Sequence, residues 1–160
     1  MTLQDYIAEQ TERVAAALAD FAATTALDRL NWEPSGEGSG LDEGGGKGRS
    51  VLDQIAECVG VNFRFAALLR GEPASEASPA LQTAASAQEQ LTASAAELAA
   101  AIRGLSDDAL EAPLQLPRGP LLTRNLMLAP YRNMAYHAGQ INFIQMLAGD
   151  TEFHSPPTWF

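Results

Sequence analysis

The sequence predicts an all-α protein, a four-helix bundle with a long Gly-rich loop between its first two helices. Three observations favour this fold. Apolar residues recur at helical spacing in long segments, capping residues precede two of these segments, and Gly- or Pro-rich stretches separate them. Four helices of about 20 residues with little strand signal are typical of a four-helix bundle.

The first helix is predicted over about residues 2–27, because Thr2 followed by Asp5 matches a capping box. Its apolar residues repeat every three or four positions: Leu3, Ile7, Val14, Leu18 and Phe21. Residues 28–34 end the helix. A loop over about residues 33–49 follows and is mostly Gly, Ser and acidic residues. So many glycines lose much conformational entropy on ordering, which predicts a flexible loop.

The second helix is predicted to begin at Ser50, whose partner Asp53 gives another capping pattern, and to stop at Gly71 and Pro73. One face of it carries Val51, Ile55, Cys58, Asn62, Phe65, Ala66 and Leu69. The third helix is predicted over about residues 79–102, where many Ala, Ser and Gln residues give a high overall helix propensity.

A short helical turn is expected near residues 107–110, and three prolines with a glycine exclude a regular helix over residues 112–120. The fourth helix is predicted over about residues 124–148, with Thr123 as its cap and Gly149 just past its end. Pro130 lies within it or close to its start, where it favours a kink.

The tail over about residues 150–160 is predicted to be non-helical, and its aromatic residues to pack on the bundle or on a second subunit. No internal repeat and no boundary signal interrupts the chain. Residues 1–160 are therefore predicted to form a single domain.

The net charge of −10 limits the classes of partner. An acidic surface repels nucleic-acid phosphates and anionic lipids, so neither nucleic acid nor a membrane is expected. The start of the chain shows no basic stretch followed by an apolar one, and the single cysteine, Cys58, cannot form an internal disulfide. Both features are typical of a cytoplasmic protein.

The Gly-rich loop does not match a nucleotide-binding loop. Leu41 stands where a P-loop needs its first glycine, and Gly48 follows Lys47 where Ser or Thr is required. Cys58 lies among apolar neighbours, where a cysteine behaves as a small hydrophobic residue. The two histidines, His137 and His154, are the remaining candidates for a general base.

Asn133 and His137 are four residues apart, so they lie one turn from each other on the helix face that also carries Ile141 and Ile144. A buried histidine needs a partner for each ring nitrogen. A metal and an acceptor behind the histidine would supply both, and hydrogen bonds within the core are the alternative. The spacing leaves both open.

The run His137-Ala138-Gly139-Gln140-Ile141 resembles the last-helix signature of the DinB-like (YfiT-like) superfamily, in which H-x-x-x-H precedes a short Gly-Gln-Ile run. Residues 50–57 resemble its S-[IV]-x-x-x-[LI]-x-H segment, which opens the second helix. Residues 30–34 and 68–71 also resemble family segments. The resemblance covers most of the chain in order and spacing, and it implies the four-helix bundle of that superfamily.

The resemblance also implies a metal site, because in this superfamily one histidine of helix two and two of helix four hold a divalent metal. The matching residues here are Glu57, Asn133 and His137, and only His137 keeps the histidine. Glutamate binds zinc, nickel, manganese or iron, whereas an amide oxygen is a weak ligand. Three interpretations remain open: an altered and weaker metal site, a metal-free hydrogen-bonded cluster, or a Glu57 that simply faces solvent.

Two functions follow from these alternatives. The resemblance implies a divalent-metal-dependent thiol transferase or related enzyme, with a low-molecular-weight thiol and a small-molecule ligand in the cavity between helices two and four. Tyr136 or Arg132 would orient the substrate. The alternative is a non-catalytic, metal-free bundle that acts as a binding module or as a homodimeric interaction module, using the third helix and the tail as contact surface.

Overall fold

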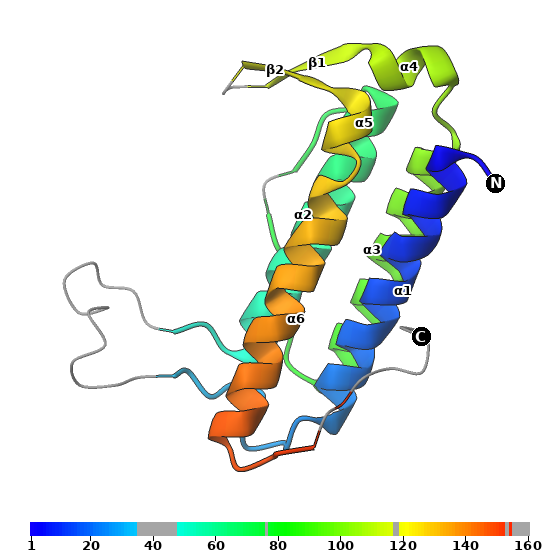
Figure 1. The fold of residues 1–160 in the computed structure, drawn as a ribbon. Coiled ribbons are helices and arrows are strands. Elements are labelled where there is room, and N and C mark those ends of the chain that lie inside the picture. Colours follow the sequence, from blue (N-terminus) through cyan, green and yellow to red (C-terminus); the bar gives the residue numbers. More distant parts are fainter. Residues whose placement is uncertain (35–47, 76, 117–118, 153, 155–160) are drawn as a thin grey trace.

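The computed structural model describes residues 1–34, 48–75, 77–116, 119–152 and 154, so most of the predicted loop and tail lie outside the described residues. Four long helices dominate it, and a short hairpin with two short helices lies between the third and the fourth (Figure 1). The long helices are α1 (Leu3–Thr24), α2 (Val51–Arg70), α3 (Ala84–Arg103) and α6 (Ala129–Leu147). The short elements are α4 (Asp107–Glu111), β1 (Pro113–Leu116), β2 (Gly119–Leu122) and α5 (Thr123–Leu126). The mainly helical fold predicted from the sequence is confirmed.

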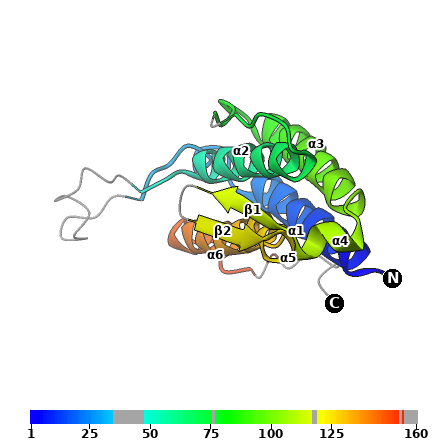
Figure 2. The same cartoon turned by 90° about the horizontal axis from the view of Figure 1, so that it is seen from above.

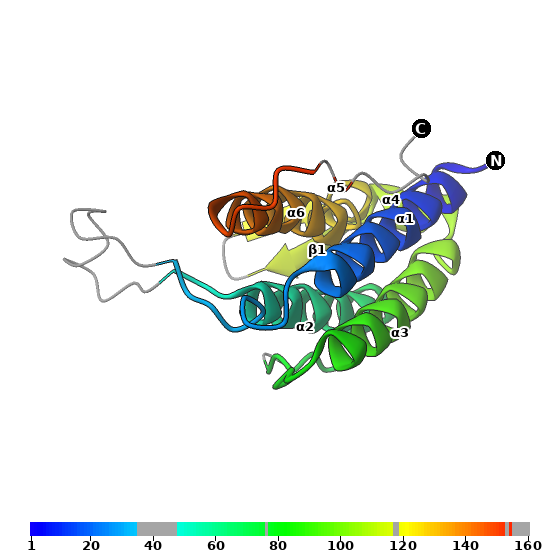
Figure 3. The same ribbon diagram turned by 90° about the horizontal axis from the view of Figure 1, so that it is seen from below.

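Each long helix packs against two others. Helices α1 and α2 both contact α3 and α6, and they touch each other little. Viewed from below, α1 and α6 form one layer and α2 and α3 the other (Figure 3). The chain after α2 returns along its side before α3 begins, so these two helices run in the same direction (Figure 1). The shared core is apolar, and its largest fully buried side chains include Leu18, Phe21, Ile55, Leu91, Met134 and Ile141.

The predicted caps of the first two helices are present. Thr2 Oγ1 accepts a hydrogen bond from the Asp5 N–H at 3.0 Å, and Ser50 Oγ accepts one from the Asp53 N–H at 3.2 Å. Each aspartate carboxylate accepts in return from the backbone N–H of the capping residue. Ser50 thereby fixes where α2 begins, and Arg49 directly precedes it.

Two predicted helix boundaries were wrong. Helix α1 ends at Thr24 rather than at residue 27, because Thr25 adopts an extended backbone and its N–H still bonds to the Phe21 carbonyl. Helix α3 begins at Ala84 rather than at residue 79, with Thr83 as its cap. The residues before Thr83 instead cross α2 at Gly60, where a Cβ would lie 2.6 Å from Ser78 Oγ. This contact holds them against α2 without helical structure, so their helix propensity does not produce a helix.

The passage over residues 112–120 was predicted to be irregular, but it contains most of an antiparallel hairpin. Strands β1 and β2 pair from Pro113 opposite Leu122 to Leu116 opposite Gly119. The prolines exclude a helix, as predicted, and a short two-stranded pair at an edge tolerates them. The hairpin lies across the end of the long helices, beside α4 (Figure 2).

The fourth predicted helix is divided into α5 and α6. Thr123 is the first residue of α5 rather than its cap, and its Oγ1 donates a hydrogen bond to the Ala112 carbonyl at 2.8 Å. Pro130 lies in the first turn of α6, where its missing N–H removes no helical hydrogen bond. Gly149 follows the helix with a φ of 90°, which agrees with the predicted end. Within the described residues, no helix is both long and apolar enough to cross a membrane.

Candidate functional site between two long helices

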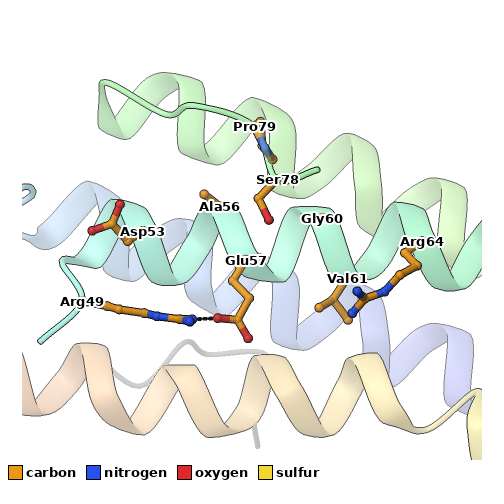
Figure 4. Close-up of a pocket in the computed structure, with 9 residues that line it drawn as sticks. All are labelled: Arg49, Asp53, Ala56, Glu57, Gly60, Val61, Arg64, Ser78 and Pro79. Carbon is orange, nitrogen blue, oxygen red and sulfur yellow. Dashed lines mark ion pairs between the residues drawn. The ribbon is translucent and has the colours of Figure 1, made fainter. Parts of the chain in front are cut away.

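Glu57 of α2 and His137 of α6 meet where these two helices pack together. The distance from Glu57 Oε1 to His137 Nε2 is 3.4 Å, and Asn133 Nδ2 lies 3.4 Å from the same oxygen. His137 is buried, and Glu57 and Asn133 are half-buried. Glu57 points towards α6 (Figure 4). The structure therefore brings together the three residues that the sequence singled out.

Gln54 is a further member of this cluster that the sequence did not indicate. Its Oε1 lies 3.2 Å from His137 Nδ1, and its Nε2 donates to the Arg49 carbonyl at 3.3 Å. Because the Gln54 oxygen is an acceptor, this orientation places the histidine proton on Nδ1. The lone pair of Nε2 then faces Glu57. Gln54 precedes Glu57 by three residues, so helical spacing was the signal that could have found it.

Arg49 is the second member that the sequence did not indicate. Its Nη1 forms an ion pair with Glu57 Oε2, the carboxylate oxygen that does not face His137 (Figure 4). The guanidinium places a positive charge beside the Glu57 carboxylate. Arg49 precedes the cap of α2 and falls in no motif, so no sequence pattern pointed to it.

The pKa of His137 is lowered from its ordinary value of 6.5, chiefly because burial disfavours the charged ring. A hydrogen bond with the Gln140 side chain opposes this effect, and the positive charge of Arg49 adds to it. The imidazole is consequently neutral at pH 7, the form that binds metals and accepts a hydrogen bond.

The cluster fits a divalent cation, although its donors are weaker than three imidazoles. Ligand atoms of a tetrahedral cation with bonds of about 2.1 Å are separated by about 3.4 Å, and His137 Nε2 and the Asn133 amide both lie 3.4 Å from Glu57 Oε1. Asn133 Oδ1 is buried without a hydrogen-bond partner among the described residues. A half-turn of the amide would present that oxygen in place of the nitrogen. In the described part of the chain, no three His, Cys, Asp or Glu side chains form a metal-binding group, so an amide ligand would be needed.

Two grooves meet at Arg49. The outer groove, of about 540 Å³, crosses the exposed side of α2 and is lined by Arg49, Asp53, Ala56, Glu57, Gly60, Val61, Arg64, Ser78 and Pro79 (Figure 4). The aromatic groove, of about 480 Å³, lies between the start of α2 and α6 and is lined by Pro34, Gly48, Arg49, Gln54, Tyr136, Gly139, Gln140, Phe143 and Ile144. Tyr136 thus lines a groove, whereas Arg132 lines neither of the two.

Comparison with known proteins identifies one family. A family model described as the DinB superfamily matches residues 10–141, a span that contains Glu57, Asn133 and His137. No curated protein and no solved structure matches the chain.

Proposed function

This chain belongs to the DinB superfamily, and on that premise we propose that it binds one divalent cation through Glu57, Asn133 and His137. The observation that carries the proposal is the convergence of their polar atoms, with both distances from Glu57 Oε1 at 3.4 Å. Zinc, nickel, manganese and iron are the cations that suit a carboxylate with an imidazole.

Two neighbouring residues support this set from behind. Gln54 Oε1 accepts a hydrogen bond from the Nδ1–H of His137, which directs the lone pair of Nε2 towards Glu57 and a cation bound there. Arg49 pairs with the outer oxygen of Glu57 and leaves the inner one directed at His137. Its positive charge also repels a cation, so we expect binding weaker than at a site of three histidines.

The activity that this site would serve is that of a thiol transferase or related enzyme. A bound cation lowers the pKa of a thiol and so provides a thiolate at neutral pH. A low-molecular-weight thiol and a second small molecule would enter between α2 and α6, where the two grooves meet at Arg49. Tyr136, which lines the aromatic groove, is placed to contact such a substrate.

The first test is a calorimetric titration of EDTA-treated, untagged protein with zinc, nickel and manganese. We expect one site per chain, weakened at least tenfold by both Glu57→Gln and His137→Gln, which is a change of about 1.4 kcal/mol. Asn133→His replaces an amide with an imidazole and should tighten binding at least tenfold. Glu97→Gln, a carboxylate of α3 outside the site, is the matched control. Absence of saturable binding, or equal binding by all these variants, would contradict the proposal.

The second candidate is a metal-free bundle that acts as a binding or interaction module. The observation that favours it is the ion pair between Arg49 and Glu57, since the guanidinium already supplies a positive charge to this carboxylate. Under this candidate the same titration shows no binding by the parent protein. Tight binding that appears only in Arg49→Gln would identify Arg49 as the residue that replaced the metal.

The remaining expectations extend this proposal. We propose that the four long helices form a four-helix bundle of the DinB/YfiT-like type, that residues 1–160 are one domain, and that the protein is cytoplasmic. A homodimer is also proposed, because Met146 and Leu147 of α6 are more than half exposed. Light scattering at several concentrations tests it, and a constant monomer mass would contradict it.

A further inference from the structure

We propose that the aromatic groove binds a small aromatic carboxylate, with the ring between Tyr136 and Phe143 and the carboxylate on Arg49. The proposal concerns a ligand of the groove and holds whether or not Glu57, Asn133 and His137 bind a cation. Its failure and the failure of the metal proposal are therefore separate results.

The apolar part of the groove is formed by one face of α6. Tyr136 and Phe143 are seven residues apart, so they lie on the same face, separated by about 10 Å along the helix axis. They are 66% and 58% exposed. Gly139 lies between them, and a Cβ built on it would meet no atom within 4 Å. Two aromatic side chains on either side of a residue without a side chain leave a slot for a flat apolar group.

The polar part of the groove favours an anion. Arg49 is the only charged residue among the described residues that line it, in a chain with 20 acidic and 10 basic residues. A guanidinium carries five N–H donors, so the pair between its Nη1 and Glu57 does not saturate it. Because Arg49 already pairs with Glu57, its side chain is partly ordered before the ligand binds. Binding of the ligand's carboxylate would therefore cost less side-chain entropy.

The size and charge of the groove select one class of ligand. A volume of about 480 Å³ accommodates a small molecule, and a guanidinium that already pairs with Glu57 still has N–H donors for one further carboxylate. A phosphate dianion carries twice the negative charge of a carboxylate, and Arg49 is already paired with Glu57. A neutral aromatic molecule would leave the guanidinium unused. A ring with a single carboxylate would contact the aromatic side chains through the ring and Arg49 through the carboxylate.

The test is an NMR titration of EDTA-treated protein with phenylacetate, followed at the backbone amides of Gly48 and Gly139. We expect saturable shifts with a Kd of about 1 mM or tighter, which is within reach of so small a ligand. Phenylacetamide, which lacks the charge, and acetate, which lacks the ring, should both bind at least tenfold more weakly.

Variants with matched controls locate the binding. Gly139→Leu should fill the slot and weaken phenylacetate binding at least tenfold, while Ala135→Leu, exposed one turn earlier on α6 and outside the groove, should not. Arg49→Gln should weaken it to the same degree, and Arg13→Gln, an exposed residue of α1, should not. A Cβ at Gly139 meets no atom within 4 Å, and leucine has the higher helix propensity, so thermal unfolding should show a folded variant.

Three results would overturn the proposal. They are no saturable shift up to about 10 mM phenylacetate, equal binding of phenylacetamide, and unchanged binding in a folded Gly139→Leu protein. Metal titration of Gly139→Leu should match that of the parent, because the leucine leaves Glu57, Asn133 and His137 in place. That comparison separates the groove from the metal site.

Discussion

His137 shows at the residue scale how its surroundings set its charge. Glu57 Oε1 lies 3.4 Å from its Nε2, yet burial lowers the pKa of the ring, and the positive charge of Arg49 adds to this effect. The lowered pKa keeps the ring neutral, which is the form that a metal ligand requires. A metal titration tests whether this neutral ring binds a cation.

The lowered pKa of His137 makes stability depend on pH. Its folded pKa lies below the unfolded value of 6.5, so the unfolded chain takes up this proton first as pH falls. The contribution of His137 to stability is complete above pH 6.5 and is lost as pH falls towards the folded pKa. Urea midpoints between pH 7.5 and 5.5 should decline less steeply for His137→Gln than for the parent. Equal slopes would contradict this account.

Cys58 is predicted to be unreactive in the folded protein. It is fully buried, and burial raises the pKa of its thiol to about 12, so almost no thiolate exists at neutral pH. A thiol-reactive chromophore should label it only as fast as the protein unfolds, and at once in denaturant. Rapid labelling under native conditions would show that α2 opens locally.

The sequence identified the central residues of the candidate site, but not Arg49 and Gln54, which contact them. Asn133 and His137 share a face through their i, i+4 spacing, and the family resemblance added Glu57. Arg49 contributes through a contact that depends on how α2 packs against α6, and it lies before the helix begins. A contact of that kind leaves no periodic trace in the sequence.

At the scale of the helices, the ends that could be predicted are those set by capping residues close by in the sequence. The caps at Thr2 and Ser50 are formed within four residues of chain, and both were predicted correctly. The end of α1 at Thr24 involves a distant partner, and the start of α3 at Ala84 combines the local cap formed by Thr83 and Ser86 with a distant contact. Gln145 of α6 donates to the Phe21 carbonyl at the end of α1, and residues before Thr83 pack on Gly60. Propensity alone places such boundaries too far out.

Gly60 and Gly139 form a matched pair within helices, and we predict opposite effects for their alanine variants. A Cβ on Gly60 would lie 2.6 Å from Ser78 Oγ and 3.2 Å from the Ala77 carbonyl, so the crossing chain must move. Gly60→Ala should destabilise the protein by about 1–3 kcal/mol. Gly139→Ala should stabilise it by about 0.5–1 kcal/mol, because nothing opposes the better helix former. Urea unfolding measures both, and a stabilising Gly60→Ala would contradict the close crossing.

At the scale of the whole molecule, acidic residues outnumber basic ones, and surface ion pairs neutralise only some of the negative charges. Arg103 of α3 binds Glu12 of α1 through two bonds, and Arg70 of α2 binds Glu97 of α3. All four side chains are a third or more exposed, so each pair contributes roughly 0.2–1 kcal/mol. With a net charge of −10, the remaining acidic residues repel one another across the folded surface.

Removing one negative charge should therefore stabilise or destabilise the molecule according to where the charge lies. Asp20 is exposed near the end of α1, where a negative charge opposes the helix dipole and the last turn holds no basic residue. Asp20→Asn should stabilise the protein by about 0.3–1 kcal/mol. Glu12→Gln breaks the pair with Arg103 and should destabilise it by a similar amount. Thermal midpoints in low salt measure both, and added salt should shrink both differences because it screens exposed charges. Two stabilising shifts would mean that the net charge alone, and not the position of each carboxylate, governs stability, and a destabilising Asp20→Asn would contradict the dipole argument.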